Sequence, residues 1–84
     1  MELYFLPLDV TSTAAITPQQ LATLLLERRK KLQLTRTYVA ELAGLSGRQL
    51  AAWEAGRVSP GFGALQRVLH VLGLELSIAV RANP

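Results

Sequence analysis

Residues 36–55 read RTYVAELAGLSGRQLAAWEA, and their spacing predicts two short helices joined by a tight turn. Ala40 stands where the two helices would come closest, so that only a small side chain fits. Gly44 can adopt the positive φ that ends a helix. Ser46 can accept a backbone N–H and so cap the second helix. The stretch therefore predicts a first helix over 36–43 and a second over 46–55.

The second helix is expected to have one buried face and one open face. Leu50 and Trp53, at i and i+3, share the buried side, so Trp53 is interpreted as a core residue. Leu45 is expected to fill the core beneath the turn. The residues left facing outward are Gly47, Arg48, Gln49, Ala51 and Ala52. A DNA-reading helix presents such a face to the major groove.

Three outward residues are candidates for base readout. Arg48 can bond a guanine edge through two hydrogen bonds, with contact to phosphate alone as the alternative. Gln49 can do the same with adenine. Ala52 offers only a methyl contact or lets the helix sit deeper. We therefore expect modest specificity for each half-site.

Four segments together resemble the Xre/Cro-type helix-turn-helix family over about residues 21–73. They are RRKKLQLT, VAELAGLS, WEAGRVSP and LQRVLHVLGL. The resemblance implies a mainly α, compact, lambda-repressor-like domain of four to five helices with short terminal β-strands that pair in a dimer. The chain divides accordingly into an arm over 1–16, the DNA-binding domain over 17–73 and a strand and tail over 74–84.

The resemblance also assigns roles to charged side chains. It implies a structural ion pair between Glu54 and Arg29. Where the family has a glutamine that meets phosphate and braces the second helix, this chain has Arg36, which keeps the phosphate contact and loses the bracing. Gln33 replaces the family's glycine and suggests a different helix end. The further phosphate contacts that we expect are Arg28, Lys31, Thr37 and Arg57, although cations at 28–31 also simply stabilise a helix C-terminus.

Two more helices are expected to flank the central pair. Thr17-Pro18 begins a helix over 18 to about 31, with Thr17 as its cap. Ser59-Pro60 is expected to open the last helical element, and Gly61 and Gly63 to delay its helix to 64–72 or to allow close approach to a phosphate. Tyr38 and Val39 are interpreted as partly buried.

The two ends of the chain contain strand-forming residues. One face of the alternating segment 74–80 carries Leu74, Leu76, Ile78 and Val80. A single strand needs a pairing partner, which is the strand predicted at 2–6, a second copy of the chain, or another protein. A short LGLEL strand after the last helix resembles the HipB-type antitoxins, whose strands pair across a dimer.

Charge and composition favour a polyanion as the partner. The net charge is +3, but residues 28–67 contain eight basic and two acidic side chains and so carry +6. The chain has no cysteine and no predicted signal peptide or membrane span, which indicates a cytoplasmic protein. His70 has no neighbouring ligand residue, so we expect no metal, no cofactor and no catalytic site.

The sequence thus predicts a homodimeric, sequence-specific DNA-binding regulator of transcription, acting as a repressor. Two subunits would read half-sites about 34 Å apart on double-stranded DNA. The HipB resemblance adds an antitoxin that acts with a HipA-like kinase toxin. The alternative is an interaction module that binds and neutralises a partner protein, with DNA binding secondary.

Overall fold

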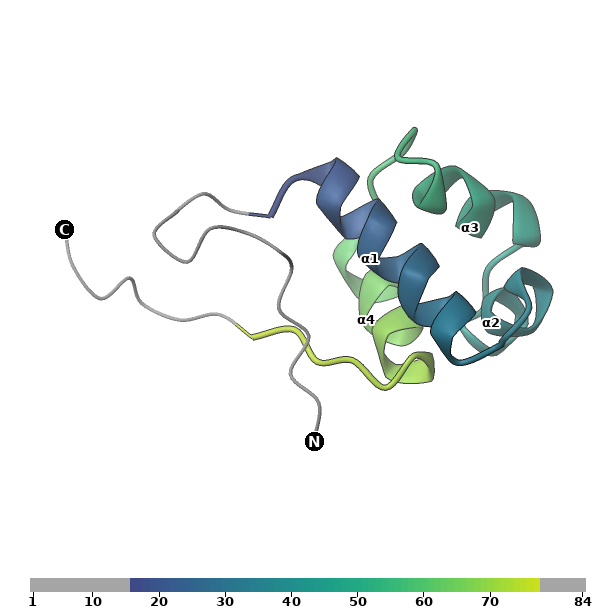
Figure 1. Ribbon diagram of the computed structural model, residues 1–84. Coiled ribbons are helices and arrows are strands. Elements are labelled where there is room, and N and C mark those ends of the chain that lie inside the picture. The colour runs from purple at the N-terminus through teal and green to yellow at the C-terminus, as the bar shows by residue number, and fades with distance from the viewer. Residues whose placement is uncertain (1–15, 78–84) are drawn as a thin grey trace, which may run out of the picture.

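A computed structural model describes residues 16–77 of the 84-residue chain. In this range the chain forms four helices and no strand: α1 (Pro18–Lys31), α2 (Arg36–Leu42), α3 (Gly47–Glu54) and α4 (Phe62–Val71). α2 and α3 are joined by a tight turn, and α1 and α4 complete a compact bundle around them (Figure 1). The predicted fold class is therefore correct for these residues: the domain is mainly α.

Hydroxyl caps begin the first three helices. Thr17, Thr35 and Ser46 each accept a hydrogen bond from the backbone N–H three residues later. α4 begins differently, because its N-cap is Gly61, which has no side chain to make the bond. The expectations that Ser59 caps this element and that its helix starts at residue 64 were wrong. Phe62 and Gly63 already lie in the first turn of α4.

All four helices end in the same hydrogen-bonded turn. In each, a backbone N–H reaches the carbonyl five residues back, as when Leu45 donates to Ala40 at 2.8 Å. The turn needs one residue with positive φ, which is Gly44 after α2 and Gln33, at φ 59°, after α1. The expectation of a different end for the first helix was therefore wrong, because Gln33 adopts the conformation that a glycine would.

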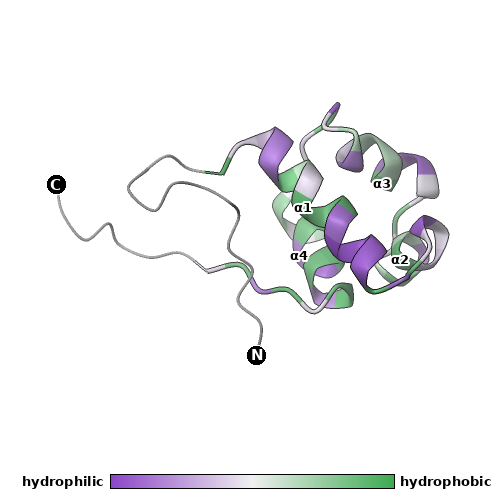
Figure 2. Cartoon of the chain, viewed as in Figure 1, coloured by the Kyte–Doolittle hydropathy of each residue, from purple (hydrophilic) through white to green (hydrophobic). Residues whose placement is uncertain are grey.

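The core lies where the inner faces of the four helices meet. Its fully buried large side chains are Leu25, Val39, Leu50, Val68 and Leu72. Trp53 and Ala40 are also buried, and Leu45 packs against the cluster, as their spacing predicts. The hydrophobic residues of α1 and α4 lie within the bundle. The C-terminal half of α1 consists largely of hydrophilic residues (Figure 2). The expectation for Tyr38 was wrong, since it is 51% exposed.

The segment after α4 differs from the prediction. Leu74 donates its N–H to Leu69 O at 2.8 Å and packs against the core, so it closes α4. Residues 74–77 are not a strand, and Leu76 is 47% exposed. The remaining strand residues, Ile78 and Val80, and the N-terminal strand at 2–6 lie outside the described residues.

Candidate nucleic-acid interface

α3 is embedded by one face and open on the other. Leu50 and Trp53 anchor it in the core, beside α1 and α2. Arg48 and Gln49 are exposed near its N-terminus. Ala51 and Ala52 are half-buried and add no polar group to the surface. Their small side chains leave the backbone of α3 open to close approach.

A buried carboxylate fixes the C-terminal end of α3. Glu54 has a side chain only 4% exposed, and it accepts hydrogen bonds from Arg29 Nε at 2.7 Å and Arg29 Nη2 at 3.1 Å. The Arg29 side chain is itself 10% exposed, and its Nη1 donates to Leu34 O at 3.0 Å. The structure thus brings together the pair that the resemblance implied. Two parallel bonds of this kind define orientation as well as proximity.

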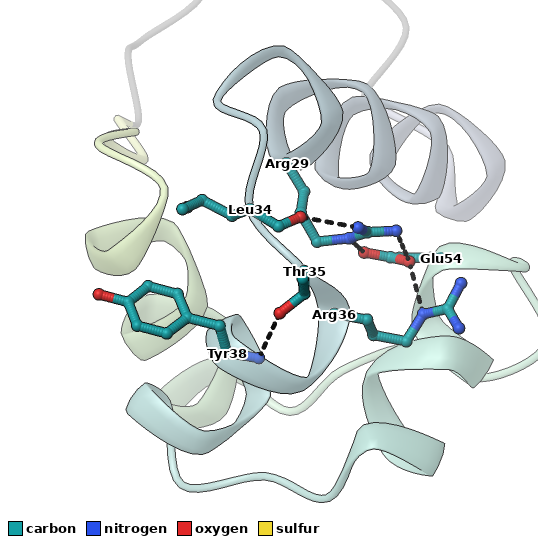
Figure 3. A network of polar contacts seen from close by, with 6 residues as sticks. All are labelled: Arg29, Leu34, Thr35, Arg36, Tyr38 and Glu54. Carbon is teal, nitrogen blue, oxygen red and sulfur yellow. Dashed lines mark hydrogen bonds and ion pairs between the residues drawn. The ribbon is translucent and has the colours of Figure 1, made fainter.

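Arg36 shares the same carboxylate from the first turn of α2. Its Nε donates to Glu54 Oε1 at 3.1 Å, while its side chain remains 47% exposed. Its two terminal nitrogens point away from Glu54 (Figure 3). Arg36 therefore does brace α2 against α3, and the expectation that arginine would lose this role was wrong. The charges of Arg29 and Glu54 cancel. The three residues Arg29, Arg36 and Glu54 together therefore retain one positive charge, on the exposed Arg36.

Three other polar side chains are directed at the carbonyls that end neighbouring helices. Arg28 Nε donates to Leu72 O at 2.9 Å, and Arg67 Nε donates to Ala43 O at 2.8 Å. Gln19 Nε2 contacts Gly56 O at 3.4 Å. Such carbonyls have no partner within their own helix. A cation beside them also interacts favourably with the negative end of the helix dipole.

Arg28 therefore has a structural contact where the sequence predicted only a phosphate contact or a general helix-end effect. The contacts of Arg67 and Gln19 were missed from the sequence. No local pattern marks them, because their acceptors lie 24 and 37 residues away.

Several predicted phosphate-binding side chains lie at the surface. Arg57 follows α3 in an exposed loop, and Lys31 and Thr37 are exposed at the end of α1 and the start of α2. Within residues 16–77, Arg48 and Arg57 make no side-chain hydrogen bond or ion pair, so both guanidinium groups remain available to an anion. No group of His, Cys, Asp and Glu within this range is arranged to hold a metal ion, and none of its helices is long and apolar enough to cross a membrane.

Gln49 takes part in a capping box at the start of α3. Its Oε1 accepts the Ser46 N–H at 2.9 Å, and its own N–H donates to Ser46 Oγ at 3.1 Å. The prediction that Gln49 bonds adenine through two hydrogen bonds needs this oxygen. In the structure one of the two lone pairs of this oxygen already accepts the Ser46 N–H, and the adenine contact stays a prediction.

Comparison with known proteins agrees with this arrangement. A family model described as helix-turn-helix matches residues 25–78, which is more than half of the chain. The chain belongs to the Xre-like helix-turn-helix family. It is also 40% identical, over 53 residues, to an uncharacterized HTH-type transcriptional regulator of Methanothermobacter thermautotrophicus. That alignment covers 63% of this chain and 77% of the relative.

Within this helix-turn-helix domain, α2 and α3 are the two helices of the motif, and the matched region includes all of α2, α3 and α4. The side chains that hold α3 in place are thus separate from those it exposes. Glu54 and Trp53 face inward, whereas Arg48 faces solvent.

Proposed function

We propose that this protein is a DNA-binding regulator of transcription that places α3 in the major groove. The observation that carries the proposal is the open face of α3: Arg48 is exposed without a partner among residues 16–77, on a helix whose other side is buried. The only acidic side chain of α3, Glu54, is neutralised by Arg29 and so does not repel DNA. Family membership and the regulator to which the chain is similar support the same function.

Most of the affinity in this proposal comes from phosphate contacts around α3. Arg36 offers its outward nitrogens, and Arg57 extends from the loop after α3. Lys31 and Thr37 add exposed groups on the helices that precede it. Contacts with phosphate position a protein on DNA, whereas contacts with base edges select the sequence. Arg48 is the residue to which we assign selection.

We further propose that two copies bind together and repress transcription by occupying the DNA. A single α3 has few side chains that can read bases, so two half-sites about 34 Å apart would add the specificity that one lacks. The antitoxin role and a HipA-like toxin partner are not part of this proposal. Both rested on a C-terminal strand, and residues 74–77 do not form one. The alternative of a partner-neutralising module rested on the same strand and on the two alanines of the reading face, Ala51 and Ala52.

Arg48→Ala tests the assignment of α3. The substitution removes a solvent-exposed side chain, so we expect folding to be unchanged and the preference for the protein's own upstream DNA over random DNA to fall about 5- to 150-fold, the equivalent of about 1–3 kcal/mol. The measurement is fluorescence anisotropy with both duplexes at several salt concentrations. Equal affinity of the wild-type protein for the two duplexes, with a shallow salt dependence, would contradict sequence-specific DNA binding.

Arg57→Ala is the matched control, because Arg57 is also an exposed arginine near α3 but lies outside the helix. Removing one phosphate contact should weaken binding to both duplexes alike and reduce the slope of log K against log salt by about 1. If Arg48→Ala instead behaved in this way, Arg48 would be a phosphate contact and α3 would select bases through other groups.

A further inference from the structure

The capping box restricts what Gln49 can offer to DNA. A backbone N–H can only donate, so the atom of Gln49 that faces Ser46 N must be the amide oxygen. The orientation of the amide follows from this chemistry. Its Nε2, which only donates, is then the polar atom that remains, and within residues 16–77 it has no hydrogen-bond partner. Gln49 is exposed, so this nitrogen is open to a ligand.

We propose, as an extension of the function above, that Gln49 reads DNA only as a hydrogen-bond donor, and that α3 selects bases with acceptor edges. Two-point recognition of adenine requires a donor for N7 and an acceptor for the N6 amino group. Oε1 has two lone pairs, and the one that accepts the Ser46 N–H holds the amide with Nε2, not Oε1, as its outward group, so the second requirement is not met. Guanine, with O6 and N7, and thymine, with O4, present acceptors and no amino group in the major groove, whereas adenine presents its N7 acceptor beside the N6 amino group.

The other exposed side chains of α3 also lack a hydrogen-bond acceptor. Arg48 has five donors and no acceptor. Ala51 and Ala52 have neither and can only contact a thymine methyl group. The carboxylate of Glu54 is buried between Arg29 and Arg36, out of reach of a base. Within 47–54 the exposed side chains therefore offer donors and methyl groups, which match guanine and thymine and leave the amino groups of adenine and cytosine without a partner.

The test is selection of bound sites from a randomised double-stranded DNA library by the wild-type protein and by Gln49→Glu. Glutamate keeps a carboxylate oxygen for the Ser46 N–H, so the capping box and α3 are preserved. It replaces the outward donor with an acceptor. Every base pair contains either guanine or thymine, so the contacted base of the selected pair is assigned with base analogues. We expect wild-type binding to weaken when the acceptor is removed, as in 7-deazaguanine, and to persist when the amino group of the partner base is removed. In Gln49→Glu, one position should shift about tenfold or more toward cytosine or adenine.

Gln49→Ala is the second variant, because an added carboxylate can weaken DNA binding altogether. It removes the donor without adding charge, and we expect it to relax the preference at that same position while the others persist. Circular dichroism of each variant checks that the helix content of the domain is unchanged. Weaker wild-type binding on removal of the adenine or cytosine amino group, at a position that Gln49→Ala relaxes, would overturn the proposal, and so would an unchanged preference in Gln49→Ala.

The two proposals fail in different ways. If the wild-type protein enriches no sequence, DNA reading by α3 is itself refuted, and the donor-only role of Gln49 with it. If Arg48→Ala alters the selected sites and both Gln49 variants leave them unchanged, the regulator stands and only the role of Gln49 is refuted.

Discussion

The two ends of α3 are held by different kinds of contact. At the C-terminal end, Glu54 is bound by Arg29 from α1 and Arg36 from α2, so three helices meet at one buried carboxylate. At the N-terminal end, the side chains of Ser46 and Gln49 bond, within residues 16–77, only to each other's backbone N–H groups, three residues apart and in solvent. The difference indicates that the C-terminal end anchors α3 to the domain, and that the N-terminal end, which carries Arg48, has its geometry set locally.

The largest effect should come from breaking the anchor with Glu54→Ala. The substitution leaves the buried guanidinium of Arg29 without its carboxylate, and an uncompensated buried charge costs about 3–5 kcal/mol. Small domains are stable by roughly 5–15 kcal/mol, so we expect a severe loss of stability. Urea denaturation followed by circular dichroism measures it. An unfolding free energy within about 1 kcal/mol of the wild-type value would show that Glu54 is not the anchor.

Replacing both partners is the control for that prediction. In Arg29→Met/Glu54→Leu no charge is stranded, and exchanging a buried ion pair for apolar side chains of similar volume is often close to neutral. We expect the double variant to be more stable than Glu54→Ala. A double variant that is less stable would mean that the packing of these side chains, and not their charge, holds α3 in place.

The N-terminal end should respond more weakly, and Ser46→Ala tests it. Loss of the N-cap hydroxyl costs typically about 1 kcal/mol. Because this end presents Arg48 to DNA, we also expect Ser46→Ala to reduce the preference for specific over random DNA. Thermal denaturation and binding anisotropy measure the two effects.

Thr17→Ala is the matched control, since Thr17 forms the same capping box on α1, away from α3. It should lower stability by a similar amount and leave the DNA preference unchanged. Equal effects of the two variants on DNA preference would contradict a special role for the N-terminal end of α3.

The same difference explains how much the sequence could predict. Caps at Thr17 and Ser46 and the turn at Gly44 depend on residues within a few positions, so local chemistry was sufficient to predict them. The Arg29–Glu54 contact spans 25 residues, and only resemblance to a family suggested it.

The contacts that Arg36, Arg28 and Arg67 make could not be predicted in this way. Each is a choice between solvent, phosphate and a carbonyl or carboxylate on another helix, and it depends on how the helices are packed. The start of α4 was misjudged for a related reason. Gly61 is the N-cap, outside the helix, and packing of the apolar face of α4 outweighs the low helix propensity of Gly63.

The smallest expected change in stability concerns the turn after α1, which helps to position Arg29. Gln33 holds φ at 59°, and this turn places Leu34 O where Arg29 Nη1 binds it at 3.0 Å. A residue other than glycine in the left-handed region costs roughly 1–2 kcal/mol, while glycine adds about 0.5–1 kcal/mol of unfolded-state entropy. Gln33→Gly should therefore stabilise the domain by about 0.5–1 kcal/mol, a rise in Tm of a few degrees.

Gln33→Ala, which retains the strain, should stay near the wild-type Tm. If Gln33→Gly melted lower than Gln33→Ala, residue 33 would carry no backbone strain.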